Sequence, residues 1–174
     1  QFERYGGSEL LDETVELVTE DPRMFLKQSI LENRKFDLIQ IASAEEVPAS
    51  SSGLLSPREN FLLTVEGIEE ALSVLTEEGI LSVTRGLQTP PRDCYRMLGI
   101  GRDALKKRGT QDPQEHVLLA RNYLAFLLMF GIAPISFGRK QRFQEVLQEL
   151  GMDPEYVPCI KIEEILPYKN EVPG

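Results

Sequence analysis

Two short segments combine residue types and spacing that bear on chemistry. Asp21 follows the β-branched run VELVT and precedes Pro22, and the segment ASAE at positions 42–45 follows the apolar run FDLIQI. A carboxylate at the start of a helix either caps that helix, because it satisfies free amides and the helix dipole, or holds a ligand. Both interpretations of Asp21 remain open at the level of sequence.

A glycine pattern in the second half of the chain formally fits a dinucleotide-binding fingerprint. Gly99, Gly101 and Ala104 match G-x-G-x-x-A. That fingerprint has a meaning only where it follows a strand and opens a helix. Here it lies inside a helical pattern that begins at Arg92, so we expect it to have no cofactor role. The pair Gly6-Gly7 is no substitute, because no strand precedes it.

Metal and nucleic-acid chemistry have no support in the sequence. Two cysteines, Cys94 and Cys159, and one histidine, His116, form no structural zinc site unless several carboxylates join them. The net charge of -9 disfavours a phosphate-backbone partner, because such binding depends on clustered Lys and Arg. The basic residues fall at helical spacing, which is typical of solvated helix faces. We therefore expect no metal and no nucleic acid.

Length and composition predict one globular domain over residues 1–174. The apolar fraction of 41% and the charged fraction of 27% are near globular norms. The scarcity of cysteine fits a reducing compartment, and no signal peptide opens the chain, so we expect a cytoplasmic location, either alone or as the soluble domain of a larger membrane-associated protein. The uncharged stretch 123–137 is too short for a spanning helix, so we expect no direct membrane insertion.

Hydrophobic periodicity predicts alternating strands and helices along the chain. The expected strands are Val15–Thr19, Phe36–Ile41, Ile80–Thr84, His116–Arg121 and Leu124–Ile135. The expected helices are Pro22–Asn33, Arg58–Thr76, Arg92–Lys107 and Gly138–Leu150. Residues 42–57 are expected to form a loop that is too long for a simple connector, and residues 152–174 are expected to form an irregular tail.

This order of elements predicts an α/β fold with a mostly parallel sheet and helices on both faces. The two late strands are separated by only a few residues, so they must be antiparallel to one another. One reversed strand should therefore lie near an edge of the sheet.

The order of elements and several short motifs resemble the spermidine synthase-like proteins. The segment FERYGGSELLDETVELVTEDPRMFL followed by RKFDLIQI resembles the middle of their domain, and TPPRDCYRMLGIGRDALKKRGTQDPQEHVLLARNYLAFLLMFGIAPIS resembles its C-terminal half. The resemblance implies a Rossmann-like, class I S-adenosylmethionine-dependent transferase fold that lacks its first two strands here. The family's glycine-rich loop and ribose-binding acid would lie before Gln1.

The resemblance also implies a partial cofactor site. Asp21 matches the acidic residue that hydrogen-bonds the adenine amino group of S-adenosylmethionine or its decarboxylated form, and Pro22 replaces a family glycine. Ala42, followed by Ser43, stands where the aminopropyl-transferring enzymes have the Asp that acts as general base. An alanine accepts no proton, so only Glu45 remains as a weak candidate acid. Candidate carboxylates for binding a polyamine are Glu45, Glu46 and Glu59.

Three functions are compatible with these residues. The first is the C-terminal part of a spermidine synthase-like domain, of the aminopropyltransferase or methyltransferase type. No residue is assigned as catalytic, and we expect no transferase activity from this chain alone. Its cofactor is S-adenosylmethionine, the decarboxylated form, or none for this fragment. The second is a non-catalytic interaction or regulatory module that keeps the fold, which the alanine at position 42 favours. The third is an unrelated Rossmann-like module whose pocket is lined by the 42–57 loop.

The family's strand order, 3-2-1-4-5-7-6, leaves Phe36–Ile41 without its usual neighbour, because the first two strands are absent. Either Val15–Thr19 pairs directly with Phe36–Ile41, or the exposed edge pairs with a further chain. That chain is the missing N-terminal half of the parent domain or a second copy. We expect a homodimer through this exposed edge.

Overall fold

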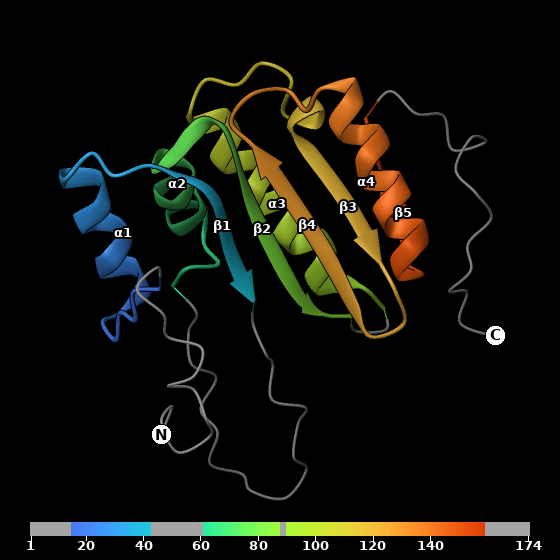
Figure 1. The fold of residues 1–174 in the computed structure, drawn as a ribbon, viewed down its shortest axis with the longest axis horizontal. Helices are drawn as coiled ribbons and strands as arrows, with labels where there is room; N and C mark the ends of the chain where they lie inside the picture. The colour runs from blue at the N-terminus through green and yellow to red at the C-terminus, as the bar shows by residue number, and fades with distance from the viewer. Residues whose placement is uncertain (1–14, 43–60, 88–89, 159–174) are drawn as a thin grey trace, which may run out of the picture.

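The computed structural model describes residues 15–42, 61–87 and 90–158 (Figure 1). Five strands in these ranges form one sheet in the order β1-β2-β4-β3-β5. The strands are β1 (Phe36–Ala42), β2 (Leu75–Gly86), β3 (Val117–Arg121), β4 (Ala125–Gly131) and β5 (Asp153–Tyr156). The helices are α1 (Pro22–Leu31), α2 (Val65–Ser73), α3 (Arg92–Lys107) and α4 (Phe137–Leu150), with a short 3-10 helix at Pro113–His116.

The sheet is mixed, which corrects the expectation of a mostly parallel one. β1 and β2 are parallel, whereas β4 runs antiparallel to both β2 and β3, and β5 runs antiparallel to β3. The antiparallel pairing of the two late strands is confirmed. Asn122 closes their short connection, because its side-chain oxygen accepts hydrogen bonds from the amides of Leu124 and Ala125. Such a short connection forces the chain to reverse between β3 and β4.

The strand expected at Val15–Thr19 is wrong. These residues form neither helix nor strand, and the side chains of Val15 and Leu17 are 50% and 53% exposed. A β-branched run becomes a strand only where a neighbouring strand pairs with its backbone, and no described strand lies beside this segment. The predicted pairing of Val15–Thr19 with β1 is therefore wrong as well, and β1 is the outermost strand of the sheet formed by the described residues.

The second helix is shorter than its periodicity predicts. The expected span Arg58–Thr76 contains the helix Val65–Ser73, while residues 58–60 lie outside the described part of the chain. Thr64 sets the start, because its hydroxyl accepts a hydrogen bond from the amide of Gly67. The end is set by the sheet, since Leu75 already pairs with Phe36 of β1.

The remaining helices follow the sequence closely. α3 covers the predicted residues, and Gly109 follows it with a φ of 86°. α4 begins after Ser136, which caps it, and ends at Gly151, whose φ of 65° suits a residue without a Cβ. The start of the expected irregular tail needs a correction, because Asp153–Tyr156 form β5. Residues 159–174 lie outside the described part.

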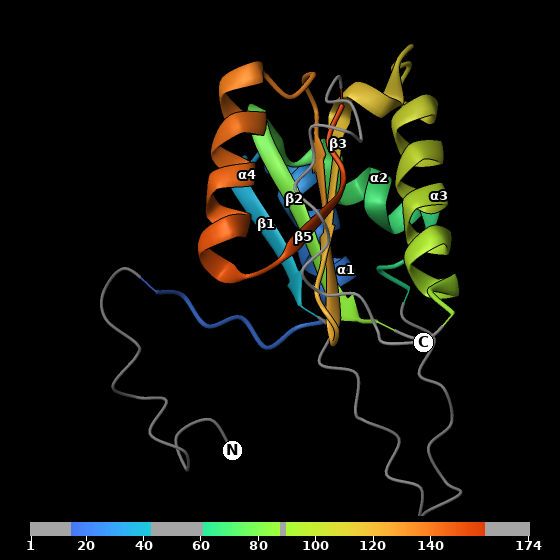
Figure 2. The same cartoon turned by 90° about the vertical axis from the view of Figure 1, so that its right-hand side faces the viewer.

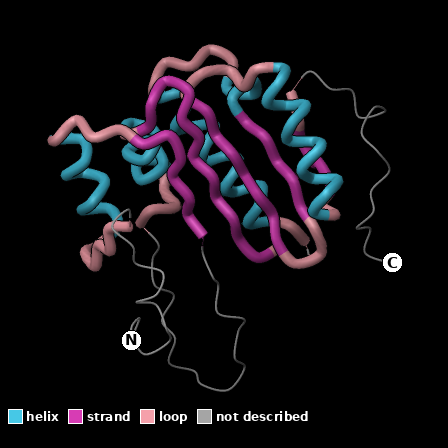
Figure 3. Tube along the Cα trace, in the orientation of Figure 1, coloured by secondary structure: helices cyan, strands magenta, loops and turns pink. Residues whose placement is uncertain are grey.

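Helices cover the two faces of the sheet unequally. Figure 2 shows α1, α2 and α3 on one face and α4 on the other, and the trace in Figure 3 shows β1 ending the sheet on the side of α1. The main core lies beneath α2 and α3 and includes Ile68, Met97 and Phe126, all fully buried. A smaller cluster around Leu118 and Ile135 lies on the α4 side. Helices on both faces are therefore confirmed.

Candidate functional site

The carboxyl ends of β1 and β2 lie at one edge of the sheet, because these two strands are parallel. The helices that follow parallel strands begin at that same edge, and ligands of open α/β sheets bind in the crevice outside the strand ends. The N-termini of α1, α2 and α3 lie on this side of the molecule (Figure 1). This edge is therefore the place to look for a site.

A groove of about 420 Å³ runs along β1 on the side of α1. Pro22 and Ala42, two residues that the sequence placed in a cofactor site, both line it. The remaining wall is largely apolar and is formed by Phe25, Leu26, Phe36, Leu38, Ile39, Gln40, Ile41 and Leu62. A largely apolar groove suits a flat ring such as a nucleobase better than a phosphate or a polyamine.

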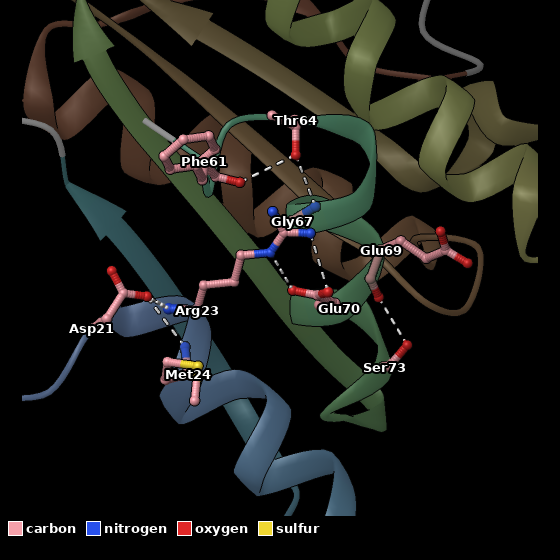
Figure 4. A network of polar contacts seen from close by, with 9 residues as sticks. All are labelled: Asp21, Arg23, Met24, Phe61, Thr64, Gly67, Glu69, Glu70 and Ser73. Carbon is pink, nitrogen blue, oxygen red and sulfur yellow. Dashed lines mark hydrogen bonds and ion pairs between the residues drawn. The ribbon is translucent and has the colours of Figure 1, made fainter. Parts of the chain in front are cut away.

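Asp21 directly precedes Pro22, a residue of the groove wall, and is the N-cap of α1. Its Oδ1 accepts hydrogen bonds from the amides of Arg23 at 2.9 Å and Met24 at 3.2 Å. The structure thus realises the capping interpretation that the sequence left open. Figure 4 shows the second carboxylate oxygen turned away from these amides. Because Asp21 is exposed, that oxygen remains accessible to a donor from outside.

A two-point ion pair fixes the start of α1 against α2. Arg23 donates from Nε to Glu70 at 2.8 Å and from Nη2 at 3.2 Å (Figure 4). Bidentate pairs of this kind restrain orientation as well as distance. The hydrogen bond to Glu70 raises the pKa of Arg23 above its usual value. The pair therefore holds Asp21 and Pro22 beside the end of β1.

Ala42 ends β1 and is exposed, and its side chain is only a methyl group. No proton acceptor is available from this side chain. Ser43 and Glu45, with Glu46 and Glu59, lie outside the described residues. Of the residues predicted for the site, the structure therefore brings Pro22 and Ala42 together in one groove, with Asp21 next to Pro22 in the chain.

The sequence analysis missed a buried ion pair at the carboxyl end of β2. Arg85 Nη1 lies 3.1 Å from Asp93 Oδ2, and the two side chains are 12% and 14% exposed. Burial lowers the pKa of Arg85, although Asp93 acts in the opposite direction. Arg96 also donates to Asp93, from a side chain that is 60% exposed. A signal was available, because an arginine directly after the apolar run of β2 and an aspartate in the first turn of α3 face the same edge.

Residues that the sequence set aside have structural roles. Gly101 lies against the ring of Phe130, so this glycine of the pattern inside α3 serves helix–sheet packing. Cys94 is buried, and desolvation raises the pKa of its thiol to about 11. His116 is buried and donates from Nδ1 to the carbonyl of Gly131 at 3.1 Å. Within residues 15–42, 61–87 and 90–158, no three His, Cys, Asp or Glu side chains gather into a metal site.

Neither a search for membrane-spanning helices nor comparisons with known proteins add information about the site. None of the helices described is both long enough and apolar enough to cross a bilayer. A comparison with protein-family models finds no match for this chain, and a comparison with curated proteins also finds none. The site is therefore interpreted from its own geometry.

Proposed function

We propose that this chain is the C-terminal part of a spermidine synthase-like, S-adenosylmethionine-dependent transferase domain. The strand order supports this proposal most directly. The strands β1, β2, β4 and β3 lie side by side in that spatial order, and β4 is antiparallel to both of its neighbours, β2 and β3. If β1 is the fourth strand of the 3-2-1-4-5-7-6 order, the observed neighbours correspond to 4-5-7-6.

The placement of the helices agrees with the same assignment. The connection from β1 through α2 to β2 joins parallel neighbours, which is the repeating unit of a Rossmann-like sheet. α1, α2 and α3 share one face, and β1 ends the sheet where the earlier strands of the full order would continue (Figures 1 and 2). These features support the finer fold class, beyond the mixed α/β sheet itself.

The proposed role of the groove is to hold the adenine end of S-adenosylmethionine or its decarboxylated form. Adenine would lie against the apolar wall, with its amino group donating to the outer oxygen of Asp21. Within residues 15–42, 61–87 and 90–158 no glycine-rich loop follows a strand, and Ala42 supplies no base. We therefore infer that the chain binds the cofactor weakly and does not transfer a group by itself.

Titration with adenosine and with inosine distinguishes a specific adenine site from nonspecific binding to an apolar surface. They differ by an amino group against a carbonyl, so only adenosine donates to Asp21. We expect adenosine and S-adenosylmethionine to shift the NMR signals of Leu26, Ile41 and Ala42. Inosine should need at least about tenfold higher concentration to produce the same shifts. Equal responses to both nucleosides, or none to either, would contradict the proposal.

Asp21→Asn is the matched variant for this titration. Asparagine caps helices about as well as aspartate, so α1 should remain intact. Its amide N–H₂ offers a donor in place of the second carboxylate oxygen, so adenosine should lose its advantage over inosine. Retained discrimination in Asp21→Asn would exclude Asp21 from the site.

The second candidate function is a non-catalytic interaction module. Ala42 at the position of the base favours it. The edge of β1 also favours it, because no other described strand pairs with β1 on the side away from β2, and such an edge is a template for association. No response to S-adenosylmethionine or adenosine, combined with self-association of the chain, would favour this function over the transferase one.

A further inference from the structure

A second cavity shares no residue with the groove beside α1. It has a volume of about 400 Å³ and lies where α3 ends, where the short 3-10 helix leads into β3, and where the chain leaves β4. Figure 2 shows the 3-10 helix next to the end of α3, at the top of the view. Cavities of this size take small molecules. Part of the wall is apolar, and the ionisable residues in it are Arg108, Asp112, Glu115 and His116.

His116 supplies this cavity with a buried polar side chain in a fixed orientation. The residue is only 6% exposed, and its Nδ1 lies 3.1 Å from the carbonyl oxygen of Gly131. Because a carbonyl oxygen only accepts, Nδ1 carries a proton in this bond. The other ring nitrogen, Nε2, has no hydrogen-bond partner among the described residues. In the neutral ring, Nε2 is therefore the acceptor that His116 offers to a molecule in the cavity.

Glu115 is held in place from two sides. Its carbonyl oxygen accepts a hydrogen bond from the amide of Ile135 at 2.9 Å. Its Oε2 accepts from Nζ of Lys140 at 2.9 Å, and the Lys140 side chain is only 8% exposed. Because Lys140 offsets the charge of this carboxylate, Glu115 adds little net charge to the cavity. This part of the wall is ordered before any ligand arrives, which lowers the entropic cost of binding.

Two exposed charged residues of the wall have no ion-pair partner in the part of the chain that the structure describes. Arg108 directly follows α3, and its Nη1 donates to the hydroxyl of Ser73 at 2.6 Å. Its remaining N–H groups are available, because a guanidinium has five. Asp112 accepts from Nε2 of Gln114 through Oδ1, and no described cationic side chain forms an ion pair with it. The cavity therefore offers one positive and one negative group.

We propose that this cavity binds a free α-amino acid with an apolar side chain. The carboxylate of the ligand pairs with the guanidinium of Arg108, and its ammonium group donates to His116 Nε2 and to the second carboxylate oxygen of Asp112. The side chain of the ligand lies against the apolar part of the wall, which is formed by Leu105, Ile132 and Pro134.

The charge pattern favours a zwitterion over an ion of one sign. A simple anion would leave Asp112 without a partner and would place a further negative charge near it, and a simple cation would do the same to Arg108. An unprotonated imidazole nitrogen accepts from an ammonium group but offers no donor to a carboxylate. The inference does not depend on the proposed transferase function, because the cavity and the groove have different walls.

Three compounds with the same aliphatic side chain test this charge pattern. L-leucine carries both charges, isocaproate lacks the ammonium group, and isoamylamine lacks the carboxylate. We expect leucine to shift the amide NMR signals of Thr110 and Ile132 and the nitrogen signal of His116 Nε2. Each analogue with one charge should need at least about tenfold higher concentration for the same shifts. An equal response to either analogue, or no response to millimolar leucine, would overturn the proposal.

His116→Asn removes the proposed acceptor while keeping the internal hydrogen bond. The asparagine amide can donate to the carbonyl of Gly131 in place of Nδ1, but it has no counterpart of Nε2. We expect leucine binding to weaken at least about tenfold in this variant. Circular dichroism and thermal unfolding would show whether the variant is folded.

Arg108→Gln tests the carboxylate end on an exposed side chain, so it does not depend on how well the His116 variant folds. Glutamine can still donate to Ser73 but has no charge. Leucine binding should weaken at least about tenfold, whereas isoamylamine binding should not weaken. Lys106→Gln is the matched control, because Lys106 is an exposed cation at the same helix end and does not line the cavity. Equal leucine binding by the Arg108 and Lys106 variants would overturn the proposal.

Discussion

Arg85 and Asp93 form a buried ion pair that joins the carboxyl end of β2 to the first turn of α3. Arg85 Nη1 lies 3.1 Å from Asp93 Oδ2, and neither side chain is more than 14% exposed. The N-cap of α3 is Pro91, which supplies no side-chain hydrogen bond. The carboxylate of Asp93, near the positive end of the helix dipole, therefore anchors this end of α3 to the sheet.

Replacing Asp93 tests this anchor. Asp93→Asn removes the negative charge next to a guanidinium that is already largely withdrawn from water. We expect a loss of about 1–3 kcal/mol in the free energy of unfolding, measured by urea denaturation. Arg96→Gln is the control, because the Arg96 side chain is 60% exposed and its ion pair should contribute less than about 1 kcal/mol. Equal losses in the two variants would show that burial of Arg85 is not the cause.

Alanine substitutions at two glycines of α3 distinguish the effect of side-chain packing on stability from the effect of helix propensity. A Cβ on Gly101 would lie 2.2 Å from the ring of Phe130, which is fully buried. Gly101→Ala should therefore cost about 1–3 kcal/mol of stability by overpacking. A Cβ on Gly99 meets no atom within 4 Å. Gly99→Ala should stabilise the chain by roughly 0.5–1 kcal/mol, since alanine favours a helix interior. Thermal unfolding should give shifts of opposite sign.

The buried thiol of Cys94 predicts a loss of stability in alkali. Burial, together with Glu155 and Asp93, raises its pKa from 9.0 to about 11. A group whose pKa is raised on folding stabilises the fold below its unfolded pKa, and the contribution is lost as the pH rises through the folded pKa. The free energy of unfolding should fall between pH 9 and 11. Cys94→Ala should remove this part of the pH dependence, and identical slopes for the two proteins would refute the assignment.

Replacing Glu115 should destabilise the fold more than replacing its ion-pair partner Lys140. The Lys140 side chain is 8% exposed and its Nζ lies 2.9 Å from Glu115, whose side chain is 32% exposed. Glu115→Ala leaves an ammonium group in a poorly hydrated position and should cost about 1–3 kcal/mol. Lys140→Met replaces the charge with an apolar chain of similar length, so its cost should be smaller. Chemical denaturation of both variants measures the difference, and the reverse order would contradict this account.

Local signals predicted the elements that carry their own start and stop residues. α3 and α4 lie where their periodicity placed them, and Gly109 and Gly151 end them with positive φ values. The strand Phe36–Ala42 lies within one residue of its predicted end. The glycine pattern at Gly99 and Gly101 was correctly assigned to the inside of a helix. In each case the interactions lie within a few residues of one another along the chain.

Signals that depend on distant partners were less informative. The run at Val15–Thr19 has the composition of a strand but no strand beside it, and Asp153–Tyr156 forms a strand because β3 offers an edge. Among the candidate site residues, Asp21 was recognised from its position before Pro22. The pair of Arg85 and Asp93 was missed, because seven residues separate them and only the packing of α3 on the sheet brings them together.

The sequence by itself determined the class of elements, the antiparallel reversal between β3 and β4, and the non-ionisable side chain at position 42. These properties depend on residue type and on short-range geometry. Only the tertiary structure decided that Pro22 and Ala42 line one groove, that Asp21 serves as a helix cap, and that β1 is outermost among the described strands. Strand neighbours and shared grooves arise from contacts between distant segments, and those contacts are set by the packing of the whole core.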